Sequence, residues 1–336
     1  MQWRNSLVPR LLDNLIWVIL ILTALGFSLV AKQFFTPYNL INVFLHSSVL
    51  GLLVIGQSFT LMTGNFDLSA EATLALTAVI GAWMMIEAPL GANWMLDPWL
   101  VVPIMLLIGG LIGAANGYLI TRVNMNNFIV TMAMQIALRG AVYIWTQGQT
   151  LTGLPKSFAW LGGGQWGPIP VSVVVVILAF IAAHFVLAYR PSGREFYAVG
   201  GNPDAAKAAG IDPKRVIMKA YIISGVMAAF AGWMLAGRLE SVIPKLGEGM
   251  IFEVFAAAVI GGVSLNGGRG TMIGAFGGVL LLSVIDSGLN LMQVSPFWIN
   301  TIRGLVILLA MFIDSQKERF RLVGAKPAAK EVSKAA

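Results

Sequence analysis

Apolar segments long enough to cross a lipid bilayer recur along almost the whole chain, and they constrain the fold more than any other feature. A straight transmembrane helix needs about 20 predominantly apolar residues. Counting such segments predicts ten crossings. They lie near residues 15–31, 46–62, 68–86, 99–121, 128–145, 170–188, 217–237, 253–265, 271–291 and 297–313. The eighth segment is too short to cross as a straight helix, so we expect it to be tilted, extended or broken.

The composition agrees with an all-α polytopic membrane protein. Hydrophobic residues make up 57% of the 336 residues and charged residues only 11%, whereas soluble domains carry about 25% charged residues. The chain contains no cysteine, which excludes disulfides, thiolate metal sites and cysteine nucleophiles. The net charge of +7 comes from basic residues beside the apolar segments, a pattern that indicates membrane topology rather than nucleic-acid binding.

The basic residues also predict the orientation of the chain. With the N-terminus in the cytoplasm, most of the 22 Lys and Arg residues fall on the cytoplasmic side, as the positive-inside rule expects. The outer side then carries Lys32, Lys156, Arg238 and Lys245. We therefore predict cytoplasmic N- and C-termini and an uncleaved first span. Residues 1–320 are predicted to form one transmembrane domain, followed by a flexible cytoplasmic tail over residues 321–336.

Three short sequence matches indicate an internal repeat. Ala78-Val-Ile-Gly-Ala82 in span three matches Ala258-Val-Ile-Gly-Gly262 in span eight, and Ile112-Gly-Ala-x-x-Gly-x-Leu119 in span four matches Ile273-Gly-Ala-x-x-Gly-x-Leu280 in span nine. Span five opens with Asn127-Phe128-Ile129, and span ten with Pro296-Phe297-Trp298. Each partner lies five spans later, so its direction through the membrane is reversed, as in alternating-access transporters. We predict two inverted five-helix repeats, over about residues 15–145 and 170–314; chance similarity in a chain rich in Gly and Ala is the alternative.

A long polar and basic segment between spans six and seven interrupts the apolar pattern. Asn202 is a good helix N-cap, Pro203 suits the first helical position, and Gly210 suits a left-handed stop. Asp212-Pro213 then begins a second helix that continues into span seven. A capped cytoplasmic helix beside a membrane bundle is suited to exchanging force with a soluble partner. A loop that merely reverses the chain is the alternative, although such a turn needs only a few residues.

Polar and aromatic side chains at membrane depth mark the predicted substrate pathway. Asp67 or Ser69 can cap span three. For Asp67, capping and a role in the pathway are equally good explanations. Neutral amides and hydroxyls suit an uncharged, polyhydroxylated solute better than an ion, although each amide alone also serves as an interhelical hydrogen-bonding group. The predicted pathway residues are Asn65, Asp67, Asn116, Asn127, Phe128, Thr131, Gln135, Phe255, Asn290 and Asn300.

Two arginines, Arg139 and Arg303, lie within the predicted spans, where a charge is costly unless it is paired or hydrated. Asp286, in the outer half of span nine, lies at the same predicted depth as Arg303. We predict a structural Asp286–Arg303 ion pair that orders the outer ends of spans nine and ten. The two histidines fall at opposite membrane edges, so we predict no metal site.

The chain lacks the motifs of an enzyme that hydrolyses ATP. It has no Gly-x-x-x-x-Gly-Lys-Ser/Thr phosphate loop and no nucleophile elbow. We therefore predict that the chain is not an enzyme and binds no cofactor itself. If transport is driven, ATP and Mg²⁺ bind to a partner ATPase.

Three motifs are specific in combination. They are Gly64-Asn-Phe-Asp-Leu-Ser69, Gly193-Arg-Glu-Phe-Tyr-Ala-Val-Gly-Gly-Asn-Pro-Asp-Ala-Ala206 with Gly210-Ile211, and Gly261-Gly-Val-Ser-Leu-Asn-Gly-Gly-Arg-Gly270. Over about residues 38–314 the chain resembles the membrane subunits of bacterial ABC importers for ribose, xylose and related monosaccharides. The branched-chain amino acid importers are more distant relatives. The first motif departs from the usual family pattern at Asn65-Phe66 and Ala70-Glu71, where Gly-Ile and Val-Gly are common.

The resemblance implies a dimer of membrane subunits, identical or paralogous, embedded in the lipid of the bacterial inner membrane. It also implies an ABC ATPase with two nucleotide-binding domains on the cytoplasmic side and a periplasmic sugar-binding protein on the other; no nucleic acid is involved. In this family the coupling loop, here residues 190–216, contacts the ATPase. The residues that the resemblance assigns to this contact are Gly193, Arg194, Gly200, Gly201, Asn202, Pro203, Asp204, Ala205, Ala206, Gly210 and Ile211.

Two functions of different classes remain open at this point. The favoured one is the permease subunit of an ATP-driven, binding-protein-dependent importer for a monosaccharide or a related polyhydroxylated solute. The alternative is a stand-alone secondary transporter or facilitator for a small neutral solute, which an inverted repeat alone would serve equally well. Sparse intramembrane carboxylates and the capped basic loop favour the importer. The sequence does not identify the sugar.

Overall fold

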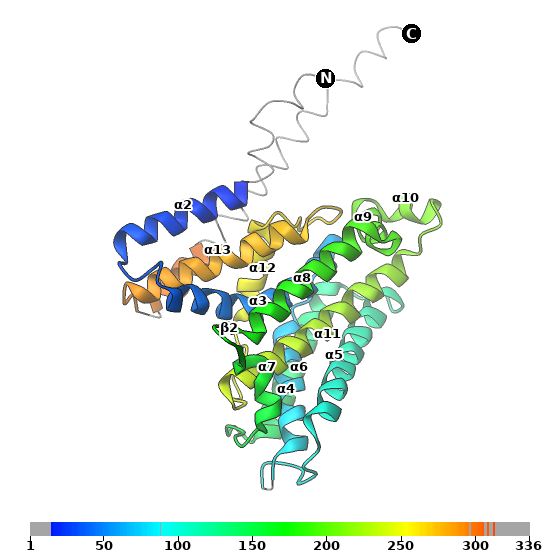
Figure 1. Cartoon of the computed structure of the whole chain (residues 1–336). Helices are drawn as coiled ribbons and strands as arrows, with labels where there is room; N and C mark the ends of the chain where they lie inside the picture. Colours follow the sequence, from blue (N-terminus) through cyan, green and yellow to red (C-terminus); the bar gives the residue numbers. More distant parts are fainter. Residues whose placement is uncertain (1–14, 88, 296, 306–307, 309–311, 313–336) are drawn as a thin grey trace, which may run out of the picture.

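The computed structural model describes residues 15–87, 89–295, 297–305, 308 and 312, and helices dominate this part of the chain (Figure 1). Residues 297–305 are helical, and the strands β1 (Gln165–Trp166) and β2 (Ile169–Pro170) form one short antiparallel pair. The other helices are α2 (Leu15–Val30), α3 (Pro37–Met62), α4 (Ala70–Met85), α5 (Pro98–Thr121), α6 (Asn127–Thr146), α7 (Lys156–Gly163), α8 (Val171–Tyr189), α9 (Pro191–Gly201), α10 (Pro203–Ala208), α11 (Pro213–Leu239), α12 (Met250–Ile260) and α13 (Met272–Leu291).

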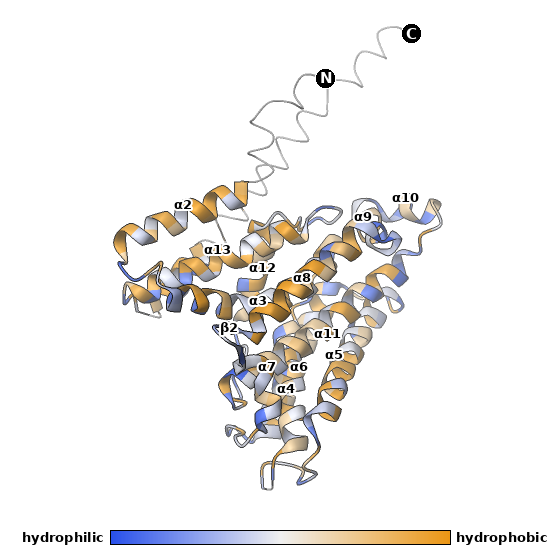
Figure 2. Cartoon of the chain, viewed as in Figure 1, coloured by the Kyte–Doolittle hydropathy of each residue, from blue (hydrophilic) through white to orange (hydrophobic). Residues whose placement is uncertain are grey.

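Six of the described helices are long and apolar enough to cross a membrane, namely α3, α5, α6, α8, α11 and α13. The helices α2, α4 and α12 are apolar but shorter, and apolar residues predominate along the long helices (Figure 2). These features identify an all-α, multi-pass membrane protein. At 11 residues, α12 is about 16 Å long, so it cannot cross the bilayer alone. The expectation that span eight is not a straight crossing helix agrees with this length.

Several predicted boundaries were wrong. Span two was predicted to begin at residue 46, but α3 begins at Pro37, because the Thr36 side chain accepts a hydrogen bond from the Asn39 N–H and caps the helix. Span eight was predicted to reach residue 265, but α12 ends at Ile260. The short helices α7 and α9 were not predicted, because neither has the long apolar run by which the spans were found. The predicted tail and part of span ten lie outside the described residues.

One of the three sequence matches that predicted the repeat does not relate equivalent positions. Ile112 lies beyond the middle of α5, whereas Ile273 lies in the first turn of α13. This match therefore gives the repeat no support. By contrast, Ala78 and Ala258 lie at the same distance from the starts of α4 and α12.

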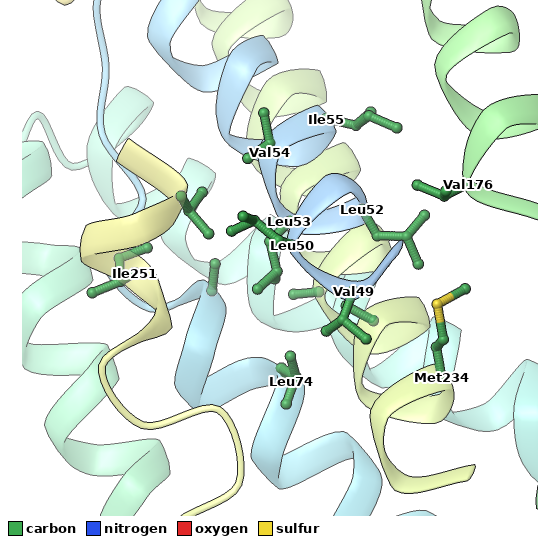
Figure 3. Packing of buried hydrophobic residues seen from close by; sticks show 14 of the residues in the cluster. Val49, Leu50, Leu52, Leu53, Val54, Ile55, Leu74, Val176, Met234 and Ile251 are labelled. Atoms are coloured by element: carbon green, nitrogen blue, oxygen red, sulfur yellow. The ribbon is translucent and has the colours of Figure 1, made fainter. Parts of the chain in front are cut away.

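Helix α11 lies at the centre of the bundle and packs against α5, α3, α4 and α7. Close approach of α5 depends on small residues, because a Cβ added at Gly109 or Gly113 would collide with the α11 backbone at Gly225 or Tyr221. Apolar side chains from five helices meet around the middle of α3 (Figure 3). Those labelled include Leu50 and Leu53 of α3, Leu74 of α4, Val176 of α8, Met234 of α11 and Ile251 of α12.

Candidate coupling segment and polar cluster

The coupling segment, residues 190–216, contains α9, α10 and the start of α11, and α9 and α10 lie far from the loop between α4 and α5 (Figure 1). The Asn202 side chain accepts hydrogen bonds of 3.0 Å from two backbone N–H groups and begins α10, with Pro203 in the first position. Gly210 has a left-handed φ of 84°, and the Asp212 carboxylate caps α11. The predicted cap, stop and second helix are therefore confirmed.

Sequence reasoning missed α9, which precedes α10. Phe196 and Val199 are buried, and the Phe196 ring lies edge-on to Phe59 of α3 with the ring centroids 5.0 Å apart. An apolar pair three residues apart, following Pro191 at a first helical position, is the signal that could have revealed this helix. The residues of the predicted ATPase contact that belong to α9 are Gly193, Arg194, Gly200 and Gly201.

Helix α10 presents a polar face outside the bundle. Asp204, Ala205 and Lys207 are exposed, whereas Ala206 is buried and Ile211, just beyond the helix, packs against the core. A single buried side chain anchors this short helix. Its outward face therefore remains accessible to a soluble partner.

The three sequence motifs meet at the end of α9, where a Cβ added at Gly267 of the third motif would lie 2.8 Å from backbone atoms of both Gly200 of the second motif and Gly64 of the first. The Gly268 N–H donates a hydrogen bond of 2.9 Å to the carbonyl of Met62, at the end of α3. The Tyr197 hydroxyl donates a hydrogen bond of 2.9 Å to the Gly270 carbonyl. Burial raises the pKa of Tyr197 above its ordinary value, because a phenolate at this position would be poorly solvated. A Cβ at Gly200 would collide with the backbone of Met62, so the end of α9 is pressed against the loops that follow α3 and α12.

The α3–α4 loop, residues 63–69, carries a buried carboxylate. Asp67 is 1% exposed. One of its oxygens accepts hydrogen bonds from the Ser69 N–H (3.0 Å) and hydroxyl (2.6 Å), and the other accepts from the Ser224 hydroxyl of α11 (2.6 Å). The Asn116 amide of α5 donates to the Ser69 hydroxyl at 2.8 Å. Ser69 is the N-cap residue of α4 but makes no side-chain capping bond, so the capping account is wrong for Ser69. Asp67 does accept a hydrogen bond from the backbone N–H of Ser69 at the start of α4, which agrees with a local role at this helix N-terminus.

The same loop brings further predicted pathway residues together. The Asn127 side-chain amide of α6 donates a hydrogen bond of 3.1 Å to Oδ1 of the Asn65 side chain. Phe66 packs against Phe255 of α12 with the ring centroids 5.9 Å apart. The α3–α4 loop therefore contacts α5, α6, α11 and α12.

The remaining predicted residues of α6 lie in different surroundings. Phe128 is 51% exposed, and the Thr131 hydroxyl donates to the Asn127 carbonyl of its own helix at 2.9 Å. The Gln135 amide donates a hydrogen bond of 2.7 Å to Glu71 of α4. Of these three residues, only Gln135 joins α6 to another helix through its side chain.

Glu71 is a buried charged residue that sequence reasoning did not assign to the site. One carboxylate oxygen accepts a hydrogen bond of 3.1 Å from the Ile251 N–H of α12, and the other lies 3.7 Å from Nη2 of Arg139. Arg139 also donates to the carbonyls of Pro244 and Leu246, in the loop before α12, at 3.3 and 3.0 Å. An acidic residue in the first turn of an apolar helix could have marked Glu71 as a site residue, but no sequence pattern predicts that it contacts Arg139.

A second charged cluster surrounds Arg303. Its Nε and Nη2 donate hydrogen bonds of 2.8 Å to the two carboxylate oxygens of Asp286, which forms the expected ion pair. Glu253 of α12, which was not predicted, lies 2.6 Å from Nη1. The predicted pathway residues Asn300 and Asn290 belong to this cluster, because Asn300 accepts from Arg303 at 3.5 Å and Asn290 donates to the Asp286 carbonyl. The structure does not place them with the residues of the α3–α4 loop.

Comparison with known proteins places the chain in a family. A family model described as the branched-chain amino acid transport system permease component matches residues 39–311. The chain belongs to this family of importer permeases. No solved structure matches it. As a permease component of an ABC importer, this multi-pass membrane protein is a transport subunit rather than an enzyme, and importers of this kind also contain ATPase and solute-binding components.

Curated relatives of this permease are sugar transporters that align over nearly their whole length. The ribose import permease of Bacillus subtilis (strain 168) is 36% identical over 292 residues, which cover 86% of this chain and 88% of the relative. The L-arabinose permease of Azospirillum brasilense is 32% identical over 92% of this chain and 89% of the relative. The galactose/methyl galactoside import permease of Haemophilus influenzae is 32% identical over 94% of this chain and 97% of the relative.

Proposed function

We propose that this permease forms the solute pathway of an ATP-driven, binding-protein-dependent importer in the bacterial inner membrane. The observation that carries the proposal is the meeting of the three motifs at the end of α9, together with the exposed polar face of α10. A partner ATPase would press on this face and bind the ATP and Mg²⁺. A periplasmic binding protein would deliver the solute to the opposite side.

The proposed solute is a monosaccharide or a related polyhydroxylated molecule. The relatives are named for ribose, L-arabinose and galactose. Neutral hydrogen-bonding groups gather where the α3–α4 loop meets α5 and α6, at Asn65, Asn116 and Asn127. Sugar hydroxyls both donate and accept hydrogen bonds, as side-chain amides do. Phe66 and Phe255 beside these amides supply the apolar surface that a sugar ring also needs.

The proposed architecture has ten crossings, cytoplasmic termini and two inverted repeats, within a dimer of membrane subunits. Helix lengths support the repeat: α3 and α11 have 26 and 27 residues, and each is followed by a loop and a short helix, α4 or α12. The matched alanines of α4 and α12 add a second line of support. In such a repeat, α4 and α12 would enter the membrane from opposite sides.

Reconstitution tests the proposal directly. The permease, the ATPase and the binding protein of the same gene cluster are placed in liposomes, and uptake of radiolabelled D-ribose, L-arabinose and D-galactose is measured with and without ATP. We expect ATP-dependent uptake of at least one sugar. Because Ala205 is exposed on α10, Ala205→Trp should abolish uptake by blocking the ATPase. The matched control Gln149→Trp, at an exposed position before α7, should keep uptake near the wild-type level.

The absence of cysteine allows a clean test of orientation. A single cysteine introduced by Asp204→Cys should react with a membrane-impermeant maleimide only in inverted vesicles, and one introduced by Gln149→Cys only in intact cells after outer-membrane permeabilisation. The reverse pattern would contradict the proposed topology.

The stand-alone transporter that the sequence left open predicts a different result. Liposomes that contain the permease alone would then equilibrate the sugar without ATP or any partner. Membership in a family of ABC importer permeases favours the driven importer.

A further inference from the structure

The coupling segment is continuous with the central helix of the bundle. Helix α11 begins at Pro213, directly after the turn that ends α10, and runs for 27 residues to Leu239. It packs against α5, α3, α4 and α7. Displacement of α10 by a partner would therefore be transmitted into α11 rather than absorbed by a flexible linker.

Two side chains of α11, three residues apart on one face, reach the α3–α4 loop. The Tyr221 hydroxyl donates a hydrogen bond of 2.7 Å to the Phe66 carbonyl. The Ser224 hydroxyl donates a hydrogen bond of 2.6 Å to Asp67. Tyr221 is fully buried and Ser224 is nearly so. The loop is thus attached to α11 at two adjacent residues.

The same loop residues also carry the candidate pathway groups. Asn65 accepts a hydrogen bond from Asn127 of α6, and Phe66 packs against Phe255 of α12. Asn65, Phe66 and Asp67 are consecutive. If α11 moves and carries Phe66 and Asp67 with it, the contacts of Asn65 and Phe66 must move as well, because no further residues separate them.

A purely structural role explains this arrangement poorly. Among the described residues no Lys, Arg or His forms an ion pair with Asp67, and burying a carboxylate without a cation is costly. Apolar side chains of similar shape would stabilise a static contact at least as well. Hydrogen bonds differ from apolar contacts in that they are directional, so they hold two segments in one register while both move.

We propose that Tyr221, Ser224 and Asp67 form a mechanical link that transfers movement of the coupling segment to the α3–α4 loop, and so to the pathway contacts of Asn65 and Phe66. Tyr221 and Ser224 are positioning residues: they act on the pathway through the loop and do not touch the solute. The proposal rests on the proposed function, in which an ATPase moves α10.

A reporter in the loop tests the link. Leu68 is half-buried, and Leu68→Cys introduces one cysteine into a chain that has none. In liposomes that hold the permease with its ATPase and binding protein, the rate of maleimide labelling of this chain is compared without nucleotide and after trapping with ATP and vanadate. We expect the rate to change by about tenfold on trapping when Tyr221 and Ser224 are present. With Tyr221→Phe and Ser224→Ala together, the change should be lost while ATP hydrolysis continues.

The matched control combines Ser58→Ala and Tyr143→Phe. The Ser58 hydroxyl bonds only within its own helix, and Tyr143 is 39% exposed, so this control makes the same chemical changes away from the link. It should keep the full change in labelling. Detergent unfolding of each variant, followed by tryptophan fluorescence, shows whether the fold is retained. The conservative Asp67→Asn keeps an acceptor for Ser224 and should retain part of the labelling change.

The outcomes separate the two proposals. A double variant that is folded, hydrolyses ATP and still shows the wild-type change in labelling overturns the link and leaves the proposed function intact. A reporter permease, with Tyr221 and Ser224 unchanged, that binds no ATPase contradicts the proposed function and the link together. The link is supported if the double variant loses the labelling change while the matched control keeps it.

Discussion

The two clusters of charge around Asp67 and Arg303 are neutralised in different ways. Asp67 is almost fully buried, and neutral hydroxyl and amide groups supply its hydrogen bonds. The Arg303 side chain is 29% exposed and is held by two carboxylates, from Asp286 and Glu253. Coulomb attraction falls slowly with distance, whereas hydrogen bonds weaken steeply when their geometry is lost. The Asp67 cluster therefore depends on accurate placement of its partners, while the Arg303 cluster tolerates small displacements.

Removal of the Asp67 carboxylate should have the largest effect on stability. Asp67→Ala leaves one backbone N–H and two hydroxyl groups without an acceptor in a closed environment. We expect the free energy of unfolding in a dodecyl sulfate titration, followed by tryptophan fluorescence, to fall by about 3 kcal/mol. Asp97→Ala is the control: Asp97 caps α5 at an exposed position, and its loss should cost about 1 kcal/mol. Equal losses at Asp67 and Asp97 would show that the buried hydrogen bonds of Asp67 are no more important than an exposed helix cap.

Removal of the arginine should have a smaller effect, although it also leaves charges unpaired. Arg303→Leu leaves Asp286 and Glu253 facing each other without a cation. Because the cluster is partly exposed, water relieves part of this penalty, and we expect a loss of about 2 kcal/mol in the same titration. Glu253→Gln in the Arg303→Leu background should recover part of the loss. A further loss on adding Glu253→Gln would show that repulsion between the carboxylates is not the cause.

Charge reversal sharpens the account of this cluster. The pair predicted from the sequence implies that Asp286→Arg with Arg303→Asp restores all that the single reversals lose. The structure predicts that the double reversal recovers only part of the lost free energy of unfolding, about 1 kcal/mol. An acidic residue at position 303 would face the carboxylate of Glu253, which opposes full recovery. Adding Glu253→Gln to the double reversal should improve the recovery. Full recovery without it would mean that Glu253 contributes nothing to holding Arg303.

Glu71 provides an intermediate case between the two clusters, since it combines neutral donors with an arginine. Glu71→Gln keeps an acceptor for the Ile251 N–H but removes the negative charge beside Arg139. We expect the free energy of unfolding, measured in the same dodecyl sulfate titration, to fall by about 1 kcal/mol. Arg139→Gln should lose a similar amount, and the double variant little more than either single one, because both belong to one interaction. Additive losses would show that the two side chains act independently.

The smallest effect is expected at the cap of α10. Asn202→Ala removes an acceptor for two backbone N–H groups, and in an exposed helix this should cost about 0.5 kcal/mol. Global unfolding should therefore change little, while amide hydrogen exchange in residues 203–208 accelerates. Asn202→Asp retains the acceptor and is the matched control. Unchanged exchange in Asn202→Ala would show that packing of Ala206, and not the cap, holds this helix.

Local signals in the sequence were sufficient for several parts of the site. The N-cap at Asn202 and the stop at Gly210 depend on side chains and backbone preferences within a few residues. The Asp286–Arg303 contact followed from residue depth, because two charges at equal depth on neighbouring spans have few other partners. Helix α9 was missed because its apolar positions are few and lie inside a polar segment.

Contacts between distant segments could not be read in the same way. No pattern near Asp67 in the sequence predicts its contact with Ser224, and no pattern near Arg139 predicts its contact with Glu71. Each contact depends on how the helices are packed. The expectation that Asn290 and Asn300 share a pathway with Asn65 had no support in the structure, because an amide at membrane depth has many faces on which it can lie.

The membrane class of this protein, most of its helices and the capped segment that would meet a soluble partner follow from apolar runs and from the preferences of neighbouring residues, so the amino-acid sequence was enough to predict them. Which polar groups meet inside the bundle depends on how the helices pack against one another. Gly56 of α3 lies directly against the backbone of Ser224 of α11, and this close packing of α3 and α11 holds Ser224 beside the loop that follows α3. A hydrogen bond requires positions accurate to a fraction of an ångström, and only the packed helices provide that accuracy.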